Sequence, residues 1–181
     1  MSKDELHYDI THITFLEKLW GDGFMSPGGK NEIEKLLQGL NLKKQKILDI
    51  GCGAGGITVS LIDDFGAQKV IGVDVEKDVV KVARDRVFKN GLKDKIEILL
   101  VDKSRLPFNN DSFDMVFCYG VIQHTGNNIE ALDCLSKMPG PQGALFLDIY
   151  PINIQGINPF VSLMRLYLNL RHYDVKKTMN L

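Results

Sequence analysis

The 181-residue chain is predicted to adopt an α/β fold, with three layers built on a mostly parallel sheet of at least five strands. Two observations predict this fold. Short apolar runs alternate with helical patterns, which is typical of parallel strands joined by crossover helices. The first apolar run also passes directly into a glycine-rich turn and then a helix, an arrangement typical of a ligand site at a strand end.

Two helices are expected before the sheet, over about residues 10–20 and 30–40, with the breaker-rich segment GDGFMSPGG between them. They would make residues 1–45 a helical lid or flank. The core is expected over 46–151, with strands at 47–50, 70–73, 96–101, 115–118 and 144–149 and helices at about 57–65, 77–89 and 129–137. Residues 152–181 are expected to form a helical tail.

Composition and charge exclude several classes of protein. A net charge of -1 without a basic face argues against nucleic acid as a partner. The three cysteines Cys52, Cys118 and Cys134 show no C-x-x-C spacing, so neither a disulfide framework nor a metal site is expected. The chain has no signal-like N-terminus and no run of 18 apolar residues, so we expect a cytoplasmic protein without stable membrane insertion.

The segment ILDIGCGAGG, residues 47–56, is the main candidate site. Its glycines permit positive φ and allow a ligand to approach main-chain N–H groups. Asp49 lies inside the strand, and a buried carboxylate is costly unless a cation or a hydrogen-bond donor meets it. An ammonium group on the ligand would meet that need.

Two cofactors fit this loop. Gly51-x-Gly53-x-x-Gly56 matches the dinucleotide fingerprint, and Asp74 at the end of the second strand could accept from ribose hydroxyls, so an NAD(P)-dependent oxidoreductase is one reading. Asp49 disfavours a pyrophosphate and suits the ammonium of S-adenosylmethionine, whose carboxylate the loop N–H groups could bind. Asp102, after the third strand, could accept from an adenine amino group. S-adenosylmethionine is therefore the preferred cofactor.

The motifs ILDIGCGAGG, VIGVD and VDKSRLPFNNDSFDMVFCYGVIQHT resemble, in order and spacing, those of class I (Rossmann-like) S-adenosylmethionine-dependent methyltransferases. The resemblance implies that Asp49 and the loop hold the methionine part, that Asp74 holds the ribose and that Asp102 holds the adenine. Tyr119 and Gly120 would line the pocket. The cofactor-binding set inferred within these motifs is Asp49, Gly51, Cys52, Gly53, Asp74, Val75, Asp102, Lys103 and Tyr119.

The N-terminal segment resembles that of phosphoethanolamine N-methyltransferases and related small-molecule methyltransferases. That resemblance implies that Met25 and Ser26 touch the cofactor, and that Tyr8 pairs with His124 to deprotonate an ammonium acceptor. From the residues alone, His124 is as well explained as a structural hydrogen bonder, and Tyr8 as an anchor for the first helix. Gly120 stands where the phosphoethanolamine enzymes usually have an acid near the amine.

The acceptor and the C-terminal part leave alternatives open. The lid pattern also resembles methyltransferases that act on lipids, and apolar side chains over 160–170 could line a lipid cavity, although such a stripe is more often core. The last two strands of the family's sheet have no counterpart after Pro151, which would leave the fifth strand with an uncovered edge. The tail or a second copy in a homodimer could cover it, or the chain could be a truncated, non-catalytic module that binds S-adenosylmethionine.

Overall fold

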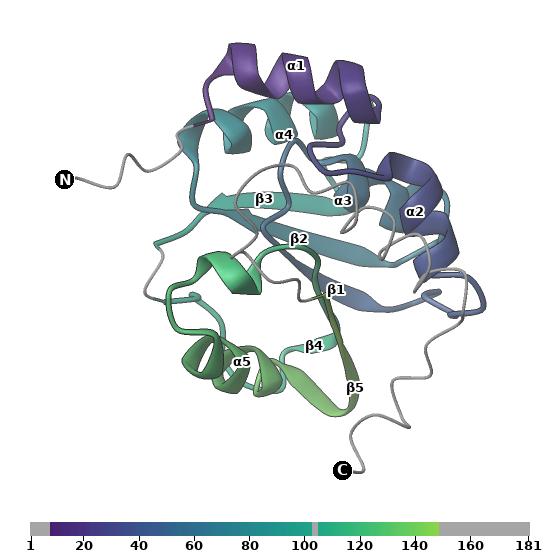
Figure 1. The fold of residues 1–181 in the computed structure, drawn as a ribbon. Coiled ribbons are helices and arrows are strands. Elements are labelled where there is room, and N and C mark those ends of the chain that lie inside the picture. The colour runs from purple at the N-terminus through teal and green to yellow at the C-terminus, as the bar shows by residue number, and fades with distance from the viewer. Residues whose placement is uncertain (1–7, 103–104, 149–181) are drawn as a thin grey trace, which may run out of the picture. The chain divides into compact units, whose positions relative to one another are not determined.

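The structure is a computed structural model that describes residues 8–102 and 105–148. Its five strands form one parallel sheet in the order β3-β2-β1-β4-β5 (Figure 1). The strands are β1 (Lys46–Ile50), β2 (Lys69–Asp74), β3 (Ile96–Leu100), β4 (Phe113–Cys118) and β5 (Pro139–Leu147). The predicted α/β class and the five parallel strands are therefore confirmed.

Alternate residues of the central strand face opposite layers of the fold, as a β-strand requires. Ile47 belongs to a core cluster with Leu61 and Val80, from the helices α3 (Gly56–Asp63) and α4 (Lys77–Lys89). The next residue, Leu48, belongs to a second cluster with Leu135 of α5 (Asn128–Ser136). The helix α2 (Gly29–Leu36) adds Ile33 to the first cluster, so the sheet is covered on both faces. The three layers follow from this alternation.

Two expected boundaries were wrong for identifiable reasons. The second helix was expected to reach residue 40 but ends at Leu36, and Gly39 then takes a φ of +84°, which a continuing helix does not allow. The fifth strand begins at Pro139 instead of 144, because Pro139 already pairs with Phe113 of β4, and a register shift separates this pair from that of Ala144 with Met115. Proline is tolerated there because it is the first residue of a strand at the sheet edge.

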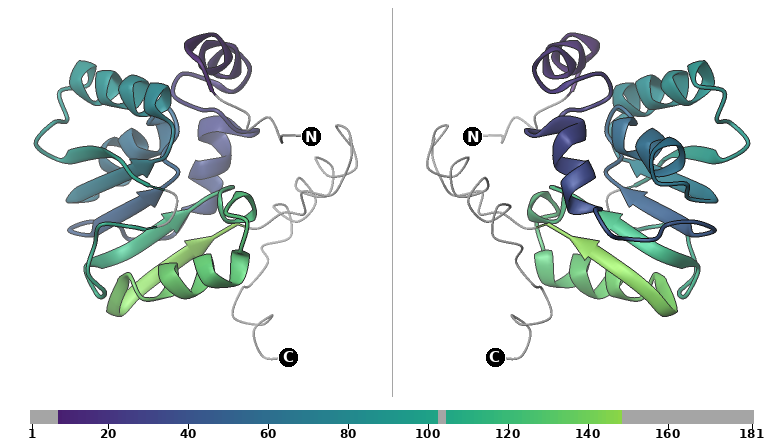
Figure 2. Two further views of the ribbon diagram at one scale, coloured as in Figure 1. Left: turned by 90° about the vertical axis from the view of Figure 1, so that its left-hand side faces the viewer. Right: turned by 90° about the vertical axis from the view of Figure 1, so that its right-hand side faces the viewer.

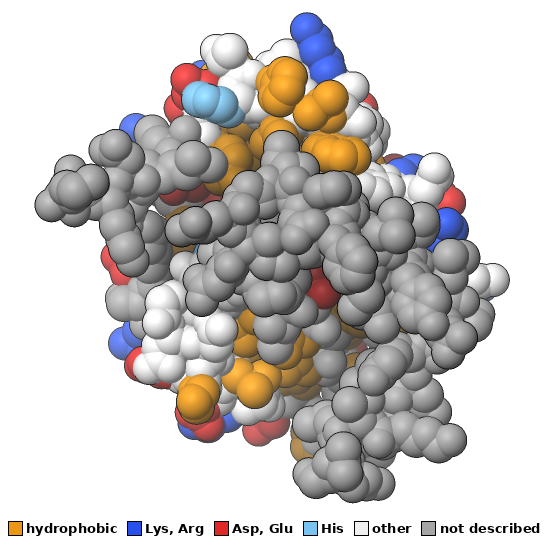
Figure 3. Space-filling view, in the orientation of Figure 1, with side chains coloured by type: hydrophobic (Ala, Val, Ile, Leu, Met, Phe, Trp, Pro, Cys, Tyr) orange, Lys and Arg blue, Asp and Glu red, His pale blue; other side chains and the backbone are white. Residues whose placement is uncertain are grey.

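The first helix, α1 (Ile10–Trp20), begins at the Asp9 side chain, which accepts from the His12 N–H. It lies beside α4 in both side views (Figure 2). Ile13 is its one buried residue, while Phe15 and Leu19 are more than half exposed. Figure 3 shows hydrophobic side chains gathered over this helix. α1 therefore packs on the outside of the core through Ile13 and leaves most of its surface exposed.

Several expectations lie outside the described residues, namely the tail over 152–181, its amphipathic helix and the absence of two further strands. The division at residues 45 and 151 stays a prediction. None of the helices in the described ranges is long and apolar enough to cross a membrane.

Candidate functional site

The candidate site lies at the edge of the sheet where the strands end. All five strands are parallel, so the residues that follow β1, β2, β3 and β4 meet at this carboxyl edge. The chain order also reverses here, because β1 lies between β2 and β4. Open α/β sheets bind ligands at such a reversal. The predicted residues around Gly51, Asp74, Asp102 and His124 come from these four connections.

The glycine loop, residues 51–56, joins β1 to α3 and depends on positive φ angles. Gly51 and Gly53 have φ values of 65° and 55°, and Gly55 precedes α3 at 87°. A Cβ atom at Gly51 would collide with the Val121 side chain, which follows β4. The loop therefore needs glycine at Gly51 for both its conformation and its close contact with the β4 connection.

Asp49 is buried beneath this loop, with 1% of its surface exposed. The Thr58 hydroxyl, on α3, donates to its carboxylate over 2.6 Å. Burial raises the pKa of Asp49 to about 7; the Thr58 hydrogen bond opposes this shift and the nearby Asp74 charge adds to it. Among the described residues, no lysine or arginine pairs with Asp49. The carboxylate thus lies in a place where a ligand cation would be stabilised.

Asp74 ends β2 and is tied to the glycine loop. Its two carboxylate oxygens accept from the N–H groups of Gly53 and Glu76, each over 3.0 Å. Burial raises the pKa of Asp74, against the effect of these backbone hydrogen bonds. Each oxygen keeps a further lone pair for a ligand hydroxyl. Val75 follows with 40% of its surface exposed, where an apolar ligand surface could cover it.

Cys52 and Tyr119, two of the predicted cofactor-binding residues, have buried side chains. The Cys52 side chain is buried against Gly72 of β2, and burial raises the pKa of its thiol well above the ordinary value. A nucleophilic cysteine needs the opposite shift. The Tyr119 ring is also buried and stacks on Phe117, with 6.1 Å between the ring centroids. The Cys52 N–H donates to the Val73 carbonyl over 3.0 Å and the Cys52 carbonyl accepts from the Gly55 N–H over 3.1 Å, so the backbone of Cys52 fixes the shape of the glycine loop. The Tyr119 ring belongs to the core cluster.

The remaining predicted residues lie at the rim or outside the described ranges. Asp102 is exposed and forms an isolated bridge with Arg105, whereas Lys103 lies outside the described residues. His124 ends the short 3-10 helix η1 (Ile122–His124) and is exposed. Tyr8 is half-buried and packs near Ile13 at the N-terminus. The pairing of Tyr8 with His124 stays a prediction.

Met25 and Ser26 are half-buried in the segment between α1 and α2. A Cβ atom at Gly53 would lie 3.5 Å from the Met25 sulfur, so the Met25 side chain borders the glycine loop. The neighbouring Gly23 carbonyl accepts from the Gly56 N–H over 3.0 Å. The structure therefore brings the N-terminal segment to the glycine loop, and the contact of Met25 and Ser26 with the cofactor stays a prediction.

Two features of this region were missed by sequence reasoning. Thr58 donates to Asp49 from nine residues further along the chain, and only the packing of α3 on β1 reveals it. Gln123 is also buried, and among the described residues its side-chain amide nitrogen and oxygen have no hydrogen-bond partner. It reads in sequence as an ordinary polar residue before His124.

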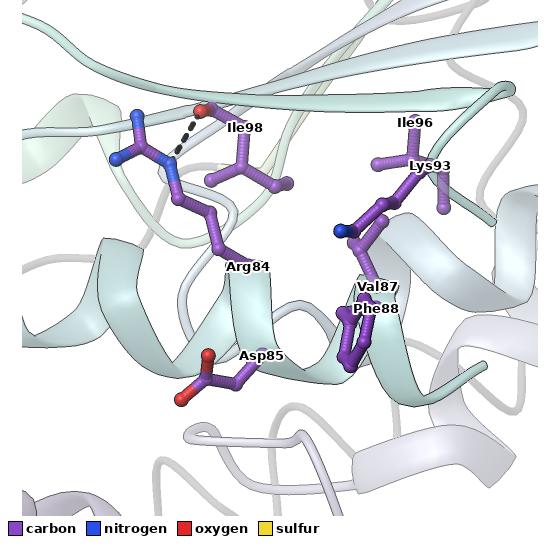
Figure 4. Close-up of a pocket in the computed structure, with 7 residues that line it drawn as sticks. All are labelled: Arg84, Asp85, Val87, Phe88, Lys93, Ile96 and Ile98. Carbon is purple, nitrogen blue, oxygen red and sulfur yellow. Dashed lines mark hydrogen bonds between the residues drawn. The ribbon is translucent and has the colours of Figure 1, made fainter. Parts of the chain in front are cut away.

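An open cavity of about 480 Å³ lies elsewhere, between α4 and β3 (Figure 4). Arg84 crosses it to donate to the Ile98 carbonyl over 2.9 Å, and the Lys93 ammonium lies 4.0 Å from the centre of the exposed Phe88 ring. Neither of these two interactions involves the glycine loop. The buried Asp49 and Asp74 carboxylates make the carboxyl edge of the sheet the better candidate for a ligand site than this cavity. No cluster of three or more metal-binding side chains occurs among the described residues.

Comparisons with known proteins agree on one family. The model of a methyltransferase domain matches residues 47–143. The chain is 31% identical over 150 residues to phosphoethanolamine N-methyltransferase 2 of Caenorhabditis elegans, covering 81% of this chain and 34% of that protein. It is 28% identical over 148 residues to phosphoethanolamine N-methyltransferase 1 of Zea mays, covering 81% of this chain and 29% of that protein.

A solved structure gives the same result. Haemonchus contortus phosphoethanolamine N-methyltransferase 2, in complex with S-adenosyl-L-methionine, aligns with a TM-score of 0.75 and 28% identity, covering 97% of this chain and 41% of that chain. The chain thus spans less than half the length of these relatives. Because the matched domain includes the glycine loop, Asp49, Asp74 and His124, the chain belongs to the methyltransferase domain family, and within it to the class I, S-adenosylmethionine-dependent type.

Proposed function

We propose that this chain binds S-adenosylmethionine at the carboxyl edge of the sheet and transfers its methyl group to the nitrogen of a small phosphobase such as phosphoethanolamine. The observation that carries the cofactor assignment is the buried Asp49 carboxylate beneath the glycine loop. A pyrophosphate beside this carboxylate would be repelled. The ammonium of the methionine part would instead stabilise the ionised form.

Each remaining residue has a proposed task in holding the cofactor. The backbone of Gly51, Cys52 and Gly53 would border the methionine part, and Asp74 would accept from the ribose hydroxyls while still bound to Gly53. Asp102 and Val75 would bind the adenine, and Met25 and Ser26 would cover the loop from the N-terminal side. Lys103 is included among the proposed cofactor-binding residues because it follows Asp102 in the sequence.

The cofactor, when bound, supplies a methyl group on a positively charged sulfur. The task left to the protein is to align the acceptor nitrogen and to remove its proton, because an ammonium has no lone pair with which to attack. We assign proton removal to His124, whose exposed position at the rim leaves it accessible to an acceptor. Tyr8 is proposed to hold the imidazole in position.

The relatives support a phosphobase acceptor over a lipid. One solved relative, from Haemonchus contortus, is in complex with phosphomonomethylethanolamine and S-adenosylhomocysteine, and it aligns over 93% of this chain with a TM-score of 0.73. Gly120 carries no acid here, so the charge recognition of the amine would have to come from other residues than in those enzymes. This difference predicts weaker selectivity for the charge state of the acceptor amine.

The proposal is tested in two steps with the purified chain. Calorimetric titration with S-adenosylmethionine, S-adenosylhomocysteine and NADH should give binding of the two adenosyl ligands and none of NADH. Methyl transfer is then measured with phosphoethanolamine, ethanolamine and a lipid quinone. Binding of NADH alone would contradict the cofactor assignment. Binding without transfer to any acceptor would indicate a non-catalytic module, and transfer to the quinone alone would contradict the phosphobase.

A further inference from the structure

Arg86 on α4 joins three separate parts of the chain. Its Nε donates to the Ala54 carbonyl in the glycine loop over 2.8 Å. Nη2 donates to the Glu17 carboxylate of α1 and Nη1 to the Asp22 carboxylate, each over 2.5 Å. Only 12% of the Arg86 side chain is exposed. The planar guanidinium satisfies several acceptors at fixed angles, which a lysine cannot do.

The segment that Arg86 holds also touches the glycine loop directly. Residues 21–26, here called the strap, are the first part of the connection from α1 to α2. The Glu17 carboxylate accepts from the Gly23 N–H over 2.9 Å, and the Gly23 carbonyl accepts from the Gly56 N–H over 3.0 Å. Gly56 is the first residue of α3, whose N-terminus faces the loop. The chain of contacts thus runs from Arg86 through Glu17 and Gly23 to the loop.

The strap is closely packed against the glycine loop and Arg86, which restricts its conformation. A Cβ atom at Gly23 would lie 2.7 Å from the Gly56 Cα and 2.9 Å from the Arg86 Nε. Phe24 is buried in the core cluster beside it, and the Met25 side chain borders Gly53. Gly23 is therefore pressed between the glycine loop and the guanidinium, at a distance that only a residue without a side chain permits.

We propose that Arg86 is a positioning residue that holds the strap against the glycine loop and so shapes the cofactor site before the cofactor arrives. Arg86 acts through Glu17, Asp22 and Ala54 and does not touch the cofactor itself. Two carboxylates around one nearly buried guanidinium give charge-assisted hydrogen bonds, which are the strong ones in proteins. A site formed in advance avoids the cost of ordering the strap on binding.

The inference rests on the proposed cofactor site, and it makes a prediction of its own. In Arg86→Met, the strap is released and the loop carbonyl of Ala54 loses its donor. If about a tenth of the molecules then hold the competent arrangement, the Kd for S-adenosylhomocysteine rises about tenfold, because apparent affinity falls with the competent fraction. Arg86→Lys should lie between wild type and Arg86→Met, since an ammonium reaches one or two of the acceptors.

Arg84→Met is the matched control, because Arg84 lies on the same helix and also donates to a backbone carbonyl, that of Ile98 in β3. Both variants are compared by calorimetry with S-adenosylhomocysteine and by amide hydrogen exchange. Arg86→Met should speed exchange at Gly23 and Gly56 while the amides of Ile47–Ile50 keep their protection. Arg84→Met should change neither the exchange at Gly56 nor the affinity by more than about twofold.

Three outcomes decide the matter. Unchanged exchange and full affinity in Arg84→Met, together with faster exchange at Gly23 and Gly56 and weaker binding in Arg86→Met, support the inference. A folded Arg86→Met that binds within about twofold of wild type, or an equal loss in the control, overturns it. Where Arg86→Met fails to fold, Glu17→Gln replaces it, with the exposed Glu34→Gln as control, and the same readouts apply. A wild-type chain that binds no adenosyl ligand removes the proposed function itself and this inference with it.

Discussion

Binding of the adenosyl cofactor should depend on pH through Asp49. The pKa of this buried carboxyl is raised to about 7, so in the ligand-free protein it is largely protonated below that pH. Only the ionised form can pair with the ligand ammonium. Half of the molecules are ionised at pH 7, about a tenth at pH 6 and about a hundredth at pH 5, so the apparent Kd for S-adenosylhomocysteine should rise about fivefold between pH 7 and pH 6 and about another tenfold by pH 5.

The affinity for the adenosyl ligand should also fall at alkaline pH, for a different reason. The ligand's own α-amino group loses its proton on the alkaline side, and the neutral amine no longer pairs with the Asp49 carboxylate, so affinity should fall again there. The measurement is a calorimetric titration in steps of half a pH unit from 5 to 9.5. Asp49→Asn keeps the shape of the side chain and the Thr58 partner but cannot titrate. Its affinity should be lower than that of wild type, and its acidic limb should be absent.

The same shift has a consequence for folding. The pKa of Asp49 is higher in the folded chain than its ordinary value of 3.8, so the folded state binds the extra proton. Stability without ligand is therefore full below about pH 4 and is lost progressively as pH rises to about 7. At about 1.4 kcal/mol per pKa unit, this loss is on the order of 4 kcal/mol. Asp49→Asn should recover part of this lost stability at pH 8, as measured by urea unfolding.

The binding experiment has its own refuting outcomes. An affinity that is constant from pH 6 to 7.5, or a fall in affinity at acidic pH that persists in Asp49→Asn, would refute the pairing of Asp49 with the ligand ammonium.

Three other substitutions probe the site. Asp74→Ala should weaken adenosyl-ligand binding by roughly 1.5–3 kcal/mol, because it removes charge-assisted hydrogen bonds, and Asp74→Asn should lose less; equal affinity in a folded variant would contradict the ribose role. His124→Ala should lower turnover on a protonated amine while the Kd for S-adenosylmethionine stays unchanged, and an unaltered rate would remove His124 from proton transfer. Gln123→Leu should raise the free energy of unfolding by about 1–3 kcal/mol, because it removes a buried amide that has no hydrogen-bond partner among the described residues; a loss of stability in thermal unfolding would show that the amide has a structural partner.

The fold was predictable because its signals are local and periodic. Strands such as 47–50 and 70–73 are apolar runs of ordinary length, and the helix at 77–89 was placed at the bounds that α4 has. The register of β5 was not predictable, because PGPQG has the composition of a turn and only pairing with β4 makes it a strand. The local composition of this segment favours a turn, but its pairing with β4 at the sheet edge decides the structure.

The candidate site was predictable where one motif contains it. The glycine loop and Asp74 follow strands that the sequence identifies, so their meeting at one edge follows from the parallel topology. Thr58, Arg86 and Glu17 could not be found in this way. Their contacts join residues 9 to 69 positions apart, and each side chain reads alone as an ordinary helical polar residue.

The two halves of the proposed reaction therefore differ in how they are encoded. The cofactor half uses backbone N–H groups and strand-end carboxylates, which the parallel sheet brings to one edge. The acceptor half depends on His124, Tyr8 and the residues around Gly120, where a single side chain can alter which amine fits. In the proposed reaction, the absence of an acid at Gly120 would remove one means of recognising the charged amine, so we expect acceptor selectivity to change within this fold while cofactor binding is kept. The measured order of acceptors, compared between wild type and Gly120→Asp, would therefore report on selectivity separately from cofactor affinity.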